Sequence, residues 1–173
     1  MVCWRPSPLL GLRGWSLLLN ALSRLAEDLD APVRWLAFHR HQDGELLDWL
    51  TDQGVVPPGL RSRSTTVMPS SLDTVFASVR KARLVIPMRL HALILARLAH
   101  CPMAALSYDP KVEAAAAMAG IPCSSLDALP AEPTLLKQWR EAMDSPADSD
   151  QIERIRAAAA HHGSHLRRYL PQR

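Results

Sequence analysis

The apolar pattern over residues 84–106 constrains the fold of this chain more than any other feature. Two short apolar runs, at residues 84–86 and 103–106, are typical of buried strands. The segment between them, residues 90–100, has the length and composition of a helix. Parallel strands need a crossover of this kind. The pattern therefore predicts a strand–helix–strand unit of a parallel sheet.

The rest of the chain continues this alternation. We predict further strands at residues 2–4, 33–38 and 65–67, and further helices at residues 15–29, 43–52, 71–79, 110–118 and 135–143. Alternating strands and helices favour an α/β fold, a single Rossmann-like doubly wound parallel sheet over residues 1–145. We expect residues 146–173 to form a C-terminal helix that packs against a further, N-terminal half of the protein. There, Asp150 and Glu153 give a capping-box-like start to a last helix.

Composition excludes several classes of protein. The net charge of +3 is not gathered into a basic run, and only two Tyr and two Phe are present, which argues against nucleic-acid binding. The longest apolar stretch is interrupted by charged residues, which argues against a transmembrane span. The three cysteines have no paired spacing, as in proteins of a reducing compartment. We expect a cytoplasmic protein, with a peripheral position at the inner membrane face as the alternative.

Charged residues follow the two central strands. Arg89 and His91 come after the first, and Asp109 and Lys111 after the second, while Arg5 follows the predicted strand at the N-terminus. Carboxyl ends of parallel strands form the edge where α/β sheets bind ligands. Arg89 offers a planar fork for carboxylate or phosphate, His91 can exchange a proton, and Lys111 is a compact cation. This pattern predicts a site for a small, multiply charged anion.

Each residue also has a structural interpretation. Arg89 can pair with Asp109 and close the end of the sheet, His91 can be an ordinary helix-start residue, and Lys111 can be solvated. Three such residues at one sheet edge favour a site over these separate roles.

Two other groups of residues contain histidines and are candidates for a cleft or a metal site. His39, His41, Gln42 and Asp43 follow the predicted strand at 33–38 and can contribute to a cleft. Their spacing matches no standard set of metal ligands, and the tract of His161, His162 and His165 is more typical of a solvated basic face. We therefore predict no metal. Trp35 and Trp49 are interpreted as core residues.

The central motifs resemble those of the polysaccharide pyruvyl transferase family, in particular the bacterial type that modifies cell-wall polymers and exopolysaccharides. The matching text is Met-Arg-Leu-His-Ala-Leu-Ile-Leu-Ala at residues 88–96 and Ala-Leu-Ser-Tyr-Asp-Pro-Lys-Val at residues 105–112. The step from His91 to Lys111, the opening Cys-Trp-Arg-Pro at residues 3–6 and the segment 38–43 fit as well.

The resemblance implies a fold and an activity. The family has a fold similar to GT-B glycosyltransferases, and this chain would correspond to its C-terminal half, with a separate N-terminal half as partner. It implies transfer of a pyruvyl ketal group from phosphoenolpyruvate, with no other cofactor, to a free, lipid-linked or nucleotide-linked saccharide. Arg89, His91 and Lys111 would hold phosphoenolpyruvate, and His91 would transfer a proton. The alternatives are a truncated, non-catalytic remnant or binding module, and the nucleotide-sugar half of a GT-B glycosyltransferase.

Overall fold

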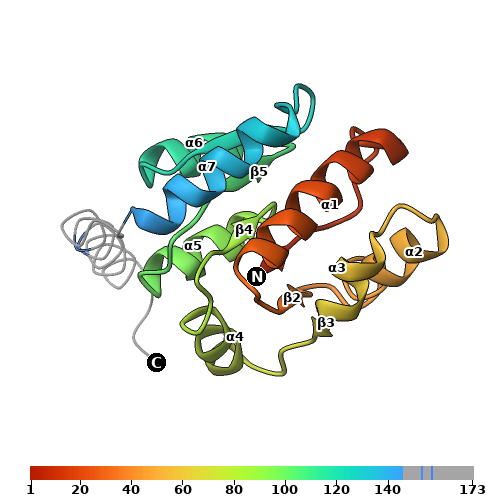
Figure 1. Cartoon of the computed structure of the whole chain (residues 1–173). Helices are drawn as coiled ribbons and strands as arrows, with labels where there is room; N and C mark the ends of the chain where they lie inside the picture. Colours follow the sequence, from red (N-terminus) through yellow and green to blue (C-terminus); the bar gives the residue numbers. More distant parts are fainter. Residues whose placement is uncertain (146–152, 154–156, 158–173) are drawn as a thin grey trace.

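Strands and helices alternate along the described chain, except that two helices lie between the second and third strands (Figure 1). The computed structural model describes residues 1–145 together with Glu153 and Ala157. Its strands are β1 (Val2–Cys3), β2 (Val33–Leu36), β3 (Ser64–Val67), β4 (Ile86–Pro87), β5 (Ala105–Ser107) and β6 (Cys123–Ser125). Its helices are α1 (Gly11–Asp28), α2 (Leu46–Asp52), α3 (Pro58–Arg63), α4 (Leu72–Val79), α5 (Leu90–Leu98), α6 (Pro110–Met118) and α7 (Glu132–Asp144).

All strand pairs are parallel, and their order fixes where a ligand site can form. Four strands pair in the order β3-β2-β1-β4, and β5 pairs with β6. A parallel bridge between Val85 and Met103 joins the two groups, and the Val85 amide donates to the Pro102 carbonyl at 2.9 Å. The order β3-β2-β1-β4-β5-β6 is that of Rossmann-type sheets, which bind ligands where the order reverses. Here the reversal lies between β1 and β4.

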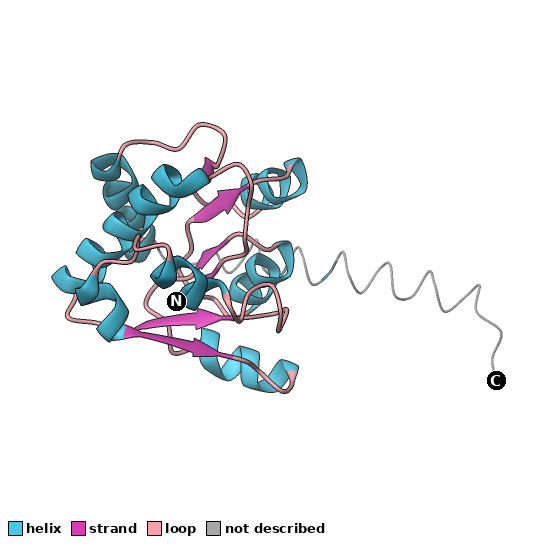
Figure 2. Cartoon of the chain, turned by 90° about the vertical axis from the view of Figure 1, so that its right-hand side faces the viewer, coloured by secondary structure: helices cyan, strands magenta, loops and turns pink. Residues whose placement is uncertain are grey.

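Helices cover both faces of the sheet (Figure 2). Successive strand residues enter different cores: Val2 and Trp35 pack with α1, α3 and α7, whereas Cys3 and Leu36 pack with α4 and α5. The residues of a strand point alternately to the two faces. Strands that are apolar at both positions therefore need cover on both sides. The predicted α/β architecture with a parallel sheet is confirmed.

The largest hydrophobic core contains the apolar face of α1 and several buried tryptophans. Leu18, Leu22 and Leu25 of α1 are buried, as their spacing predicts. Trp35 is also buried, as predicted. Trp49 is 45% exposed, so its assignment to the core is wrong. It falls outside the stripe through which α2 packs on the core, which consists of Leu46, Leu47 and Leu50.

Several element boundaries differ from the predictions. Helix α1 begins at Gly11, before the predicted start at residue 15, and Gly11 itself has a φ of +47°. Helix α2 begins at Leu46 because residues 40–45 form turns. Helix α3 and the edge strand β6, with its polar Cys-Ser-Ser sequence, were not predicted. The predicted last helix and the histidines after residue 160 lie outside the described residues.

The described part of the chain contains no helix with the length and hydropathy that a bilayer span requires.

Candidate functional site

Three loops at the carboxyl edge of the sheet carry the predicted site residues. Arg5 follows β1, Arg89 follows β4, and Tyr108 to Lys111 follow β5. Strands β1, β4 and β5 are consecutive in the sheet. The topology therefore brings these loops to the carboxyl edge of the sheet, near the point where the strand order reverses.

Arg89 is the N-cap residue of α5, and its side chain reaches across the end of β1. Its backbone is extended, with φ of −94° and ψ of 132°, and no side chain caps the helix. The guanidinium Nη2 donates to Asp43 Oδ1 at 2.5 Å and to Gln42 Oε1 at 3.1 Å, both in the loop after β2. Its Nε is buried and has no hydrogen-bond partner among the residues that the structure describes.

Asp43 is held by its own loop as well as by Arg89. Its side chain is only 1% exposed. Oδ2 accepts hydrogen bonds from the backbone amides of Phe38 and His39, each at 3.0 Å. A buried carboxylate is tolerated where its oxygens are hydrogen-bonded and its charge is paired. Both conditions are met here.

Asp109 does not pair with Arg89 as the structural interpretation of the sequence proposed. It is the N-cap residue of α6, where Oδ1 accepts from the Lys111 amide at 2.8 Å. The carboxylate binds this amide because a short side chain at an N-cap lies next to the free amides of the first helical turn. The structural alternative, in which Arg89 pairs with Asp109, therefore does not describe this edge; Arg89 pairs with Asp43.

A second arginine contact crosses the end of β4. Arg5 Nη1 donates to the Tyr108 hydroxyl at 3.1 Å, and the guanidinium carbon lies 4.9 Å from the centre of the Tyr108 ring. This combines a hydrogen bond with a cation–π contact. Each arginine thus reaches past a neighbouring strand, and links the loop after β4 to that after β2 and the loop after β1 to that after β5.

His91 and Lys111 are the remaining predicted cationic residues. Both are exposed and lie in the first turns of α5 and α6, which pack against each other. Within the described residues, neither side chain makes a hydrogen bond or an ion pair. The start of a helix attracts anions through its free amides and its dipole. At the start of α5, which no side chain caps, these residues add to that attraction.

The sequence missed part of this cluster. Tyr108 belongs to the second central motif, but no role was predicted for it, and Gln42 and Asp43 were only weak candidates for a cleft. The available signal was position: Gln42 and Asp43 follow β2 at the same sheet edge as Arg89.

The described residues offer little for metal or thiol chemistry at this edge. They contain no group of three or more histidine, cysteine, aspartate or glutamate side chains that could hold a metal ion. His39 is exposed, and His41 Nδ1 lies 3.5 Å from Oε1 of the exposed Glu45 in the same loop. All three cysteines are free, and burial raises the pKa of Cys3 to about 12. A thiol with such a pKa stays protonated at neutral pH and is a poor nucleophile.

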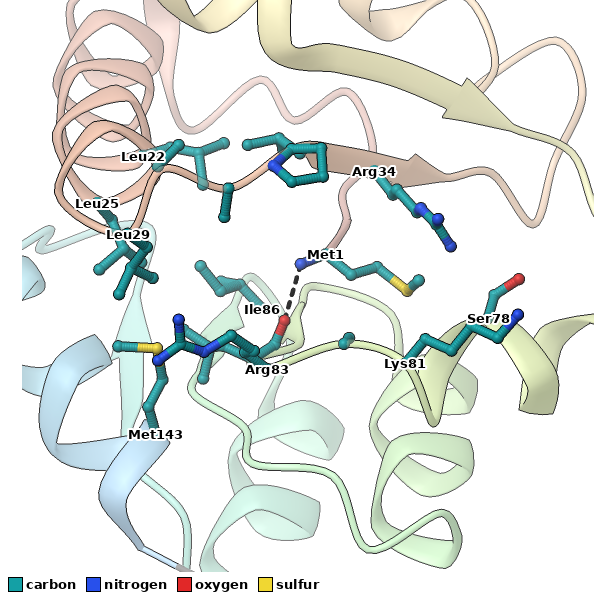
Figure 3. Close-up of a pocket in the computed structure, with 16 residues that line it drawn as sticks. Met1, Leu22, Leu25, Leu29, Arg34, Ser78, Lys81, Arg83, Ile86 and Met143 are labelled. Atoms are coloured by element: carbon teal, nitrogen blue, oxygen red, sulfur yellow. Dashed lines mark hydrogen bonds between the residues drawn. The ribbon is translucent and has the colours of Figure 1, made fainter.

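A separate cavity of about 220 Å³ lies at the opposite, amino edge of the sheet (Figure 3). Its walls are mainly apolar, and include Leu22, Leu25 and Ile86. Arg34, Lys81 and Arg83 are the basic residues that line it. The Met1 amine, which also lines the cavity, donates to the Leu84 carbonyl at 2.8 Å, the contact dashed in Figure 3. None of the predicted site residues lines this cavity.

Comparisons with known proteins found no relative of this chain. The sequence matches no protein-family model. Searches of curated proteins and of solved structures found no similar protein.

Proposed function

We propose that this chain is the donor-binding, C-terminal domain of a polysaccharide pyruvyl transferase. In this proposal it binds phosphoenolpyruvate for transfer of a pyruvyl ketal group to a saccharide. The observation that carries the proposal is the set of basic residues at the carboxyl edge. Arg5, Arg89, His91 and Lys111 follow consecutive strands at the reversal of strand order, and the start of α5 has no side-chain cap.

The ligand chemistry agrees with this set of residues. Phosphoenolpyruvate combines a planar carboxylate with a phosphate, so it needs several cations within a short distance. A guanidinium suits either anionic group because its hydrogen bonds to an anion are charge-assisted. The contacts with Gln42 and Asp43 both use Nη2, so the Nη1 group of Arg89 keeps its N–H donors for a bound anion. Lys111 suits the phosphate as a point charge.

The proposed transfer requires proton movements in both directions. The methylene carbon of phosphoenolpyruvate takes a proton and becomes a methyl group, while one sugar hydroxyl oxygen bonds to the adjacent carbon and loses its proton. A second hydroxyl then displaces phosphate from that carbon and releases its own proton. The product is a cyclic ketal. His91 is our candidate for one of these transfers because imidazole exchanges protons near neutral pH.

The described edge supplies one side of such a site. A transferase must also bind the saccharide and exclude water around the reacting carbon. In the proposal, a second α/β half supplies these functions across the crevice. The sugar acceptor, free or linked to a lipid or nucleotide, would bind between the two halves.

One rival function has its own support. The reversal of strand order between β1 and β4 is where doubly wound sheets bind nucleotides, and α1, which follows β1, has no side-chain cap. The rival is the nucleotide-sugar half of a GT-B glycosyltransferase. It predicts binding of a uridine nucleotide in preference to phosphoenolpyruvate.

Calorimetric titration of the full chain with phosphoenolpyruvate and with uridine diphosphate separates the two functions. We expect phosphoenolpyruvate to bind, and Arg89→Gln and Lys111→Gln each to weaken binding by about tenfold or more, the loss expected for a charge-assisted hydrogen bond. Lys81→Gln is the matched control because Lys81 is also exposed but lies at the opposite edge. Tighter binding of uridine diphosphate, or equal losses in all three variants, would contradict the proposal.

A further inference from the structure

We propose that Asp43 is a positioning residue that fixes the Arg89 guanidinium for anion binding. Nothing in the sequence pattern assigns this role to the loop after β2. The identity of the anion rests on the proposed function, whereas the positioning itself rests on contacts in the unliganded protein.

The two oxygens of Asp43 have separate partners. Oδ2 accepts from the amides of Phe38 and His39, and these bonds tie the carboxylate to its own loop. Oδ1 accepts from Arg89. The carboxylate is therefore oriented by the backbone, and its second oxygen is presented to a residue that lies 46 positions away in the chain.

The contact also determines which donors of Arg89 remain for a ligand. A guanidinium has five N–H groups. Asp43 and Gln42 both accept from Nη2, while the buried Nε has no partner within the described residues. An arginine held at one nitrogen in this way keeps an oriented set of donors. Less rotamer freedom is then lost when an anion binds.

Charge supports the same role. Arg5 and Arg89 follow neighbouring strands, with His91 in the next turn. Positive charges at short range repel one another. The buried Asp43 carboxylate offsets one positive charge on the side away from Lys111, since β2 and β5 lie on opposite sides of the β1–β4 pair. Arg89 can then stay near the other cations without a bound anion.

A double-mutant cycle tests whether Asp43 acts through Arg89. Asp43→Asn keeps an oxygen for the two amides and removes the charge, and Arg89→Gln removes the proposed donor. We expect Asp43→Asn to raise the Kd of phosphoenolpyruvate by about tenfold, and to have no further effect in Arg89→Gln, as for residues that act as one unit. Glu45→Gln is the matched control because it removes an exposed carboxylate of the same loop.

A second readout follows the Arg89 side chain directly and does not need phosphoenolpyruvate. In nitrogen-15-labelled wild-type protein, the Arg89 Nε–H signal is identified by its loss in Arg89→Gln. We expect it to exchange slowly with water, and its Nη groups to rotate slowly, in the unliganded chain. In Asp43→Asn, both processes should become fast, whereas Glu45→Gln should leave them slow.

The outcomes separate the two proposals. If wild-type protein does not bind phosphoenolpyruvate but its Arg89 signals behave as expected, the proposed function fails and the positioning role stands. The positioning role is overturned if the wild-type guanidinium rotates freely. It is also overturned if Asp43→Asn weakens binding equally in the presence and absence of Arg89.

Discussion

Trp4→Phe and Trp35→Phe form a matched pair that tests how the core beneath the site is stabilised. Both indoles are buried, at 2% and 3% exposure, and their rings meet edge to face with centres 5.3 Å apart. They differ in their polar atom. Trp35 Nε1 donates to Ser64 Oγ at 3.1 Å, whereas Trp4 Nε1 is buried with no hydrogen-bond partner among the described residues.

The structure gives a magnitude for the difference in stability. Both substitutions remove the same atoms from a packed core, and large-to-small series give about 2 kcal/mol for a loss of this size. Trp35→Phe also loses a hydrogen bond worth about 1 kcal/mol, for a total of about 3 kcal/mol. Trp4→Phe instead removes an unsatisfied N–H group that costs about 1–3 kcal/mol, so its net effect lies between about 1 kcal/mol of destabilisation and about 1 kcal/mol of stabilisation.

Urea unfolding followed by far-ultraviolet circular dichroism measures both changes without relying on tryptophan fluorescence. We expect Trp35→Phe to be less stable than Trp4→Phe by about 2 kcal/mol or more. Trp49→Phe is the control, because Trp49 is 45% exposed and its change should stay within about 0.5 kcal/mol. Equal destabilisation by the two core substitutions would show that the hydrogen bond of Trp35 and the unpaired donor of Trp4 do not decide core stability.

Three further predictions concern the site. His91→Ala should lower phosphate release at saturating phosphoenolpyruvate by about 100-fold or more, in protein supplied with an N-terminal half, because general acid–base catalysis is lost; loss of affinity alone would contradict this. Tyr108→Phe should weaken phosphoenolpyruvate binding about two- to tenfold, measured by calorimetry, because Arg5 loses a hydrogen bond but keeps the ring. Asp109→Ala should lower stability in urea by about 1 kcal/mol because α6 loses its cap; an unchanged unfolding midpoint would exclude that role.

Local sequence patterns were sufficient to predict much of the fold. The unit from β4 through α5 to β5 was recognised because apolar runs of strand length flank a helix-length segment. The positions of Arg89, His91 and Lys111 at one sheet edge followed from the same unit. Glycines marked helix ends: Gly54 and Gly120 follow α2 and α6 with φ of +70° and +61°, a conformation that favours glycine.

Pairings between distant loops were not predictable in this way. Asp109 was the obvious partner for Arg89 because it follows the next strand along the chain. The observed partner, Asp43, follows a strand that is two positions away in the sheet, on the other side of β1. Strand order decides this contact, and no local pattern of apolar residues reports strand order. Strand β6 was missed for a related reason, because an edge strand needs less apolar sequence than a buried one.

For the anion site we propose, the pairing of side chains matters more than the number of cations at the edge. Arg5 and Arg89 are each oriented by a group from another loop in the unliganded protein, so they lose little freedom when an anion binds. His91 and Lys111 are exposed and make no side-chain contact of this kind within the described residues, so an anion must order them. We therefore expect the arginines to set the position of the anion. In the proposed function, His91 and Lys111 become ordered around the anion after it binds. His91 is then in position to transfer a proton only when the substrate is present.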